Sequence, residues 1–126
     1  MREEETSANK TLGMRGEEIA LRYLKQRRYR VLEINYRCRC GEIDIIARDG
    51  TAFVFIEVKT RRTSSYGPPQ LSVTPLKQRR ISKAALTWLA NNRLMEKDAR
   101  FDVVGVFLSN DGPVVEHITN AFDLAY

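Results

Sequence analysis

The alternation of apolar and polar residues along the chain predicts two amphipathic helices. The first runs from Leu12 to about Arg28. Its apolar side chains recur at helical spacing, at Ile19, Ala20, Tyr23 and Leu24. The second helix begins with Thr74 as its N-cap and Pro75 as its first helical residue, and it ends near Asn91. Each helix therefore has an apolar face that must pack against another layer of the fold.

Runs of apolar and β-branched residues predict strands between and after the helices. These runs are Arg30–Tyr36, two strands within Gly41–Lys59, Arg100–Leu108 and Val114–Ile118. The first three strands follow one another through short turns and should pair antiparallel. The second helix connects the third strand to the fourth and is long enough for a parallel connection. The sequence therefore predicts an α/β fold, a mixed sheet of about five strands between helices in three α/β/α layers.

The segment Gly41–Lys59 is expected to form a hairpin whose turn lies at Asp49-Gly50. The dipeptide Asp-Gly between apolar runs is typical of a type I′ turn. Because side chains alternate between the two faces of a strand, this turn places Asp44, Glu57 and Lys59 on one face. Asp44 and Glu57 would then be diagonal neighbours, about 7 Å apart.

Two carboxylates in a sheet of Ile, Val and Phe residues need a physical reason. Asp44 and Glu57 would repel each other and lose hydration. A divalent cation would remove both costs, because hard cations take oxygen ligands. Lys59 points the same way and could hold a water molecule or a phosphate oxygen. The alternative is a solvent-exposed hairpin edge on which Glu57 and Lys59 form a solvated pair.

Several basic and polar residues follow this hairpin. Arg61 and Arg62 lie in a predicted loop, Thr60–Pro69, and arginine can bind phosphate through two hydrogen bonds. In the second helix, Lys77 lies at the start of the apolar face. Lys77 and Gln70 are the residues best placed to reach back to the sheet. All four are candidates for nucleic-acid binding, and a solvated loop and helix surface are the alternatives.

The chain has 126 residues, a net charge of +5 and a pI of about 9.5. This length suits a single domain, residues 12–126, behind a flexible lead of residues 1–11. The positive charge favours a polyanionic partner. No apolar run approaches the length of a membrane span, and the N-terminus lacks an apolar signal core. We therefore expect a cytoplasmic protein without a membrane partner.

Other reactive or charged side chains have simpler interpretations. Cys38 and Cys40 are expected to be free thiols, because no second pair of Cys or His completes a zinc site. The only histidine, His117, is expected to be exposed. Glu17 lies on the flank of the first helix, where it could lean towards the sheet or act as a first-turn acid favoured by the helix dipole. Asp102 has no predicted role beyond that of a polar residue at a strand start.

A set of short motifs occurs in order along the chain. They are Gly16-Glu17, Asn35-Tyr36-Arg37, Gly41–Ala47, Phe55–Arg61, Lys77 and Arg100–Val104. Over roughly residues 12 to 108, this combination resembles the YraN family of small bacterial proteins. The resemblance implies membership of the PD-(D/E)xK nuclease superfamily. It also implies a restriction-endonuclease-like fold, related to that of archaeal Holliday junction resolvases.

The resemblance implies roles for individual residues. Asp44 matches the superfamily's aspartate, and Glu57 and Lys59 match its Glu-x-Lys motif. Glu17 matches its helix acid, which favours a site residue over a cap. Mg²⁺ or Mn²⁺ would be held by Asp44, Glu57 and the carbonyl group of Val58, with Glu17 acting through water.

These roles predict a function. We expect an endonuclease-like protein that hydrolyses DNA, with branched or damaged DNA as candidate substrates and a homodimer as a candidate assembly. A nucleic-acid-binding module without catalysis and an interaction adaptor on the same fold are the alternatives.

Overall fold

The computed structural model describes residues 12–62 and 67–125. The predicted flexible lead, residues 1–11, lies outside the described residues, as do residues 63–66 of the predicted loop and residue 126. The described strands form one sheet in chain order: β1 (Arg30–Cys38), β2 (Gly41–Asp49), β3 (Ala52–Arg61), β4 (Ala99–Ser109) and β5 (Gly112–Phe122). β3 and β4 are parallel, and the other neighbours are antiparallel. The predicted mixed sheet of about five strands is confirmed.

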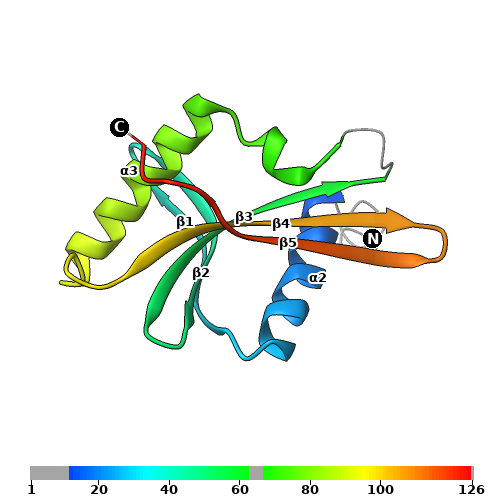
Figure 1. Ribbon diagram of the computed structural model, residues 1–126, viewed down its shortest axis with the longest axis horizontal. Helices are drawn as coiled ribbons and strands as arrows, with labels where there is room; N and C mark the ends of the chain where they lie inside the picture. The colour runs from blue at the N-terminus through cyan, green and yellow to red at the C-terminus, as the bar shows by residue number, and fades with distance from the viewer. Residues whose placement is uncertain (1–11, 63–66, 126) are drawn as a thin grey trace, which may run out of the picture.

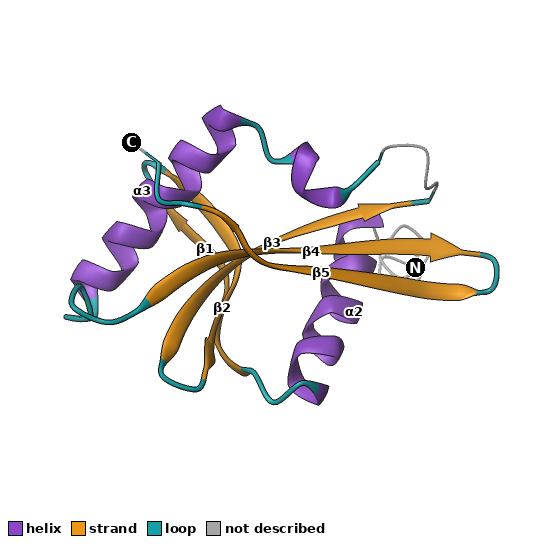
Figure 2. Ribbon diagram, viewed as in Figure 1, coloured by secondary structure: helices purple, strands orange, loops and turns teal. Residues whose placement is uncertain are grey.

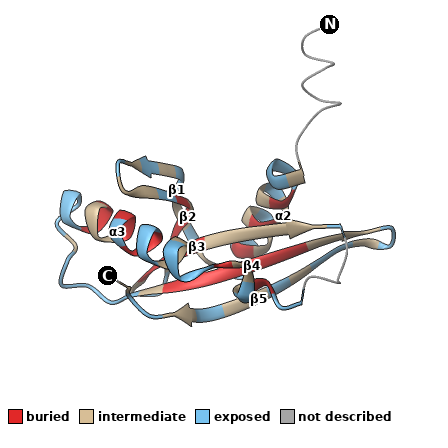
Figure 3. Ribbon diagram, turned by 90° about the horizontal axis from the view of Figure 1, so that it is seen from above, coloured by how far each residue is buried: buried red, intermediate tan, exposed pale blue. Residues whose placement is uncertain are grey.

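One long helix covers each face of the sheet (Figures 1 and 2). α2 (Leu12–Gln26) shares a buried cluster with Ile56 of β3, whereas α3 (Pro75–Asn91) packs Trp88 against Phe55 of the same strand. Neighbouring strand residues thus belong to two different cores, and Figure 3 shows the buried positions of β4 between the helices. The predicted three-layer arrangement follows. No described helix is long and apolar enough to cross a membrane.

The β2–β3 hairpin turns one residue later than predicted. Asp49 pairs with Ala52, so the two-residue loop is Gly50-Thr51 and not Asp49-Gly50. Gly50 has a φ of 62°, while Thr51 is not among the residues with positive φ. A type II′ turn needs a glycine at its first central position only, whereas type I′ needs positive φ at both. The predicted register is therefore wrong by two residues, but an even shift leaves each side chain on its predicted face.

The helix ends follow local backbone chemistry. α3 begins as predicted, because Thr74 Oγ1 accepts a hydrogen bond from the backbone N–H of Lys77 at 3.2 Å. α2 ends just before the predicted boundary, because Arg28 has a φ of 68° and cannot continue a right-handed helix. The predicted loop after β3 is shorter than expected. β3 extends through Arg61, and the 3₁₀-helix η2 occupies Pro69–Ser72.

Asp102 lies in a buried polar network on the α2 side of the sheet. Its Oδ2 lies 2.8 Å from Nε2 of His117, and its Oδ1 accepts hydrogen bonds from Nε of Arg100 and the backbone N–H of Asn120, each at 3.0 Å. The His117 side chain is only 8% exposed, and its Nδ1 lies 3.3 Å from the Tyr23 hydroxyl of α2. The prediction of an exposed histidine is wrong, because α2 and β4 supply partners that are distant in sequence. Asp102 has a structural role, because its contacts with His117 and Asn120 join β4 to β5.

Candidate functional site

The centre of the site is the point where the β2–β3 ladder ends. The last pair is Ile45 opposite Ile56, and the next residues along are Asp44 and Glu57. There, Oδ2 of Asp44 accepts a hydrogen bond from the backbone N–H of Val58 at 2.8 Å, so a side chain takes the place of a strand carbonyl. The corrected register makes the two acids direct neighbours across the hairpin. They are not the diagonal neighbours that we predicted.

The two carboxyl groups bind protons unusually tightly. Burial and, next, the charge of Asp44 raise the pKa of Glu57 to about 8, against the opposing charge of Lys77. Burial also raises the pKa of Asp44, although the hydrogen bond from Val58 lowers it. Glu57 is therefore largely protonated at neutral pH in the free protein. Both shifts arise because ionised carboxylates lose hydration in this part of the sheet and repel each other.

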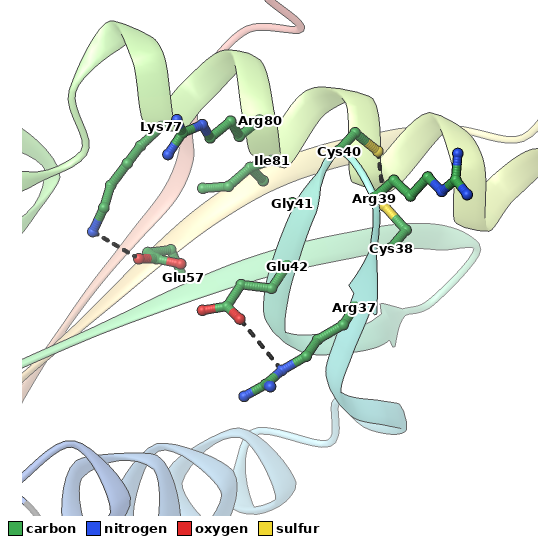
Figure 4. Close-up of a pocket in the computed structure, with 10 residues that line it drawn as sticks. All are labelled: Arg37, Cys38, Arg39, Cys40, Gly41, Glu42, Glu57, Lys77, Arg80 and Ile81. Atoms are coloured by element: carbon green, nitrogen blue, oxygen red, sulfur yellow. Dashed lines mark hydrogen bonds and ion pairs between the residues drawn. The ribbon is translucent and has the colours of Figure 1, made fainter.

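Two lysines face these acids. Lys77 extends from the first turn of α3, and its Nζ lies 3.7 Å from Oε2 of Glu57 (Figure 4). Burial and, next, the charge of Lys77 lower the pKa of Lys59. Lys59 therefore releases its proton more readily than an exposed lysine does. The structure brings both predicted lysines to the acid pair.

α2 brings a third carboxylate to the pair. Gly16 of α2 lies so close to β3 that a β-carbon there would overlap the Thr60 hydroxyl. This contact sets Glu17 beside the end of β3. The pKa of Glu17 is raised by burial and then by the charges of Asp44 and Glu42. The described part of α2 begins at Leu12, so Glu17 is not in its first turn and the alternative of a helix-dipole acid is wrong.

The other predicted nucleic-acid contacts are more scattered. Arg61 donates a hydrogen bond to the Gly67 carbonyl at 2.6 Å and lines a separate hollow beside β4 and β5. Arg62 is exposed after the end of β3. Oε1 of Gln70 is buried without a hydrogen-bond partner among the described residues. Of the four predicted contacts, only Lys77 has a described contact with the acid pair.

Sequence reasoning missed Glu42 and the hollow beside it. The charge of Glu42 raises the pKa of both Asp44 and Glu17, so it faces the same site. The sequence does contain a signal for Glu42, because this residue precedes Asp44 by two positions in the same strand and should lie on the same face. A hollow of about 490 Å³ opens next to it (Figure 4). Its lining is Arg37, Cys38, Arg39, Cys40, Gly41, Glu42, Glu57, Lys77, Arg80 and Ile81.

The donor set can be compared with the needs of a cation. No group of three or more His, Cys, Asp or Glu side chains within residues 12–62 and 67–125 is arranged to hold a metal ion. Mg²⁺, however, is commonly bound by one or two carboxylates together with waters and substrate oxygens. Asp44 and Glu57 supply two such carboxylates, in surroundings that disfavour their charge in the absence of a counter-ion. The residues present therefore fit a site of that kind.

Comparison with known proteins gives one consistent result. The model of the family described as "Uncharacterised protein family UPF0102" matches residues 16–106. A UPF0102 protein of Geobacter sulfurreducens is 60% identical over 119 residues, which cover 94% of this chain and 93% of the relative. A UPF0102 protein of Geotalea uraniireducens is 59% identical over 127 residues and 100% of both chains. One from Anaeromyxobacter dehalogenans is 43% identical over 112 residues, 89% of this chain and 84% of the relative.

Proposed function

We propose that this chain, which belongs to the UPF0102 family, is a metal-dependent endonuclease-like protein that hydrolyses phosphodiester bonds in DNA. One observation carries the proposal. Asp44 and Glu57 lie side by side at the end of a buried ladder, both with raised pKa values, and Lys59 follows on the same strand face. Clustered, strongly perturbed titratable groups are typical of functional sites. The resemblance to the PD-(D/E)xK superfamily supports the same assignment.

Each residue has a separate task in this proposal. Asp44, Glu57 and the carbonyl group of Val58 would hold Mg²⁺ or Mn²⁺, and Glu17 would orient a bound water. Such an ion neutralises charge on a phosphate and acidifies an attacking water. Glu57 must release its proton before it can act as a ligand. Lys59 would orient the attacking water or stabilise the negative charge that develops on the phosphoryl oxygens.

A second candidate function is a nucleic-acid-binding module without catalysis. The observation that favours it is the basic character of the surroundings, since cations line the hollow beside Glu57 and the whole chain carries a charge of +5. An interaction adaptor is the third alternative. A site that served only as a protein contact would gain nothing from a buried acid pair, because neutral side chains of similar shape would avoid its electrostatic cost.

Parallel cleavage assays test the proposal. Wild type, Asp44→Asn, Lys59→Ala and the exposed-turn control Asp111→Asn would be purified together and incubated with Mg²⁺ or Mn²⁺. The substrates are linear duplex, single-stranded, flap and four-way-junction DNA. We expect cleavage by wild type and Asp111→Asn only, because Lys59 acts mainly on the transition state and Asp44 holds the metal.

Binding to the same DNA separates the alternatives. Lys59→Ala should keep much of the wild-type DNA affinity although it does not cleave. Equal cleavage by all four proteins would indicate a contaminating nuclease. That result, or the absence of cleavage on every substrate, would refute catalysis and leave the binding module in place.

A further inference from the structure

The hollow beside Glu57 is a built feature of the fold. It lies between the turn that joins β1 to β2 and the first half of α3 (Figure 4). A β-carbon on Gly41 would lie 2.9 Å from the backbone oxygen of Arg80, so only a glycine lets the hairpin approach the helix this closely. Further along α3, Sγ of Cys40 lies 3.6 Å from the Thr87 hydroxyl. The two walls are thus fixed relative to each other by direct contact.

The hollow has an excess of positive charge. Four basic residues line it against two acids, Glu42 and Glu57. Both acids lie near basic side chains, because Arg37 lies 3.4 Å from Glu42 and Lys77 lies 3.7 Å from Glu57. Arg80, on the α3 wall, has no acidic partner among the described residues. The ligand that this lining favours is an anion, and arginine is suited to phosphate.

The size and position of the hollow restrict the anion further. A volume of about 490 Å³ is that of a small-molecule site, so it matches the size of one nucleotide better than that of a base-paired segment. Glu57 belongs both to this lining and to the acid pair, so an occupant would be adjacent to a phosphate held there. We infer that the hollow binds an unpaired nucleotide of a DNA strand through its phosphate, next to the phosphate at the acid pair. The inference deepens the proposed function and rests on it only for the placement of the strand.

Figure 4 indicates which cations to change. Arg37 comes from the hairpin wall and Arg80 from the α3 wall, whereas the Arg39 side chain points away from Glu57. The test variant is therefore Arg37→Gln/Arg80→Gln. The matched control is Arg79→Gln/Lys83→Gln, which removes the same charge from exposed positions of α3 outside the hollow.

The first assay measures binding of a fluorescent 12-nucleotide single strand and of a 12-base-pair duplex at several salt concentrations. EDTA is present throughout, so that catalysis has no part in the result. The loss of one neutralised phosphate should reduce the slope of log affinity against log salt by about 0.7 for the single strand. The slope for the duplex should change less, and the control variant should keep both wild-type slopes.

The second assay needs no substitution. Cys38 and Cys40 are the only cysteines of the chain, and both line the hollow. A single strand bound there should slow their alkylation by iodoacetamide, measured by intact mass, by several-fold. A duplex at the same fractional saturation should leave the rate unchanged.

Several results would overturn the inference. They are an unchanged slope in Arg37→Gln/Arg80→Gln, an equal change in the control variant, and the absence of single-strand binding by wild type. Equal protection of the cysteines by duplex would refute the assignment to an unpaired strand. These outcomes are independent of cleavage. If the wild type binds the single strand as described but never cleaves DNA, the proposed function is refuted and the nucleotide site in the hollow is not. If the wild type cleaves DNA but Arg37→Gln/Arg80→Gln keeps the wild-type salt slopes, the nucleotide site is refuted and the proposed function is not.

Discussion

Replacing Glu57 with glutamine should stabilise the protein at neutral and alkaline pH. The reason is the raised pKa of Glu57, about 8 in the folded chain against an ordinary value of 4.5. Between these values the folded chain keeps a proton that the unfolded chain has released. Stability is therefore lost as the pH rises from 4.5 to 8, because the folded state binds more protons. Glutamine has no proton to lose and escapes this penalty.

The size of the effect follows from the shift. Each pKa unit corresponds to about 1.4 kcal/mol, so the full difference from 4.5 to about 8 amounts to roughly 5 kcal/mol. Between pH 6 and pH 8, about 2 to 3 kcal/mol of this should be lost by wild type and not by Glu57→Gln. For a domain of this length, that free energy corresponds to a change in Tm of roughly 10 °C.

Thermal unfolding followed by circular dichroism at pH 6, 7 and 8, with EDTA present, measures this difference. The matched control is Glu116→Gln, which neutralises an exposed acid on β5. We expect the control to follow wild type across the range, while the Tm of Glu57→Gln rises relative to both as the pH increases. Parallel profiles for wild type and Glu57→Gln would refute the claim that Glu57 titrates near pH 8 in the folded state.

Three further predictions follow from the same contacts. Binding of Mn²⁺ at pH 7 should release close to one proton, because Glu57 must ionise to become a ligand. Calorimetry in two buffers of different ionisation enthalpy measures the number of protons released. Asp44→Asn should abolish the heat of Mn²⁺ binding. Gly16→Ala should lower stability by about 1 to 3 kcal/mol in urea unfolding, because the new methyl group overlaps Thr60, and a wild-type midpoint would contradict the packing of α2 on β3. Asp102→Asn should cost about 3 to 5 kcal/mol at pH 7, because it removes the buried carboxylate that pairs with Arg100. The hydrogen bonds to Asp102 lower its pKa despite burial, so their stabilising effect should be present above the ordinary pKa of 3.8 and should decrease as the pH falls below it. Urea unfolding at a series of acidic pH values should therefore show a difference between Asp102→Asn and wild type that shrinks as the pH falls.

The sequence predicted the faces of the central hairpin better than its register. Asp44, Glu57 and Lys59 still come together although the turn was misplaced, because the shift was by an even number of residues. The alternation of β2 is nevertheless interrupted beside Asp44, since Ile43 packs in the α3 core and Ile45 in the α2 core. Register depends on which residue takes the positive φ. The Asp-Gly rule assigns positive φ to both residues, whereas in the structure Gly50 takes it and Asp49 remains in the strand. Asp49 is held there by Nη2 of Arg100 at 3.0 Å, a contact that no local pattern indicates.

Other features of the fold and site required tertiary structure. His117 and Asp102 are fifteen residues apart, and their surroundings include Tyr23 from α2, so no short motif could reveal the network. The hollow was missed for a related reason. Its two walls come from the β1–β2 turn and from α3, and the residue that lets them meet is Gly41, whose contact with α3 no local sequence pattern indicates.

Lys77 belongs to both the acid pair and the hollow, and this makes the two ligands interdependent. In the free protein its ammonium group lies 3.7 Å from Glu57, and its charge adds to the effect of burial in lowering the pKa of Lys59. A divalent cation bound by Asp44 and Glu57 would keep both carboxylates ionised and would repel the nearby ammonium group of Lys77. A phosphate group would then reduce the electrostatic repulsion between the ammonium groups of Lys59 and Lys77. The metal removes the repulsion between the two carboxylates, and the phosphate removes the repulsion between the two lysine ammonium groups. Metal and phosphate should therefore bind cooperatively, and linkage requires that each strengthen the binding of the other by the same factor.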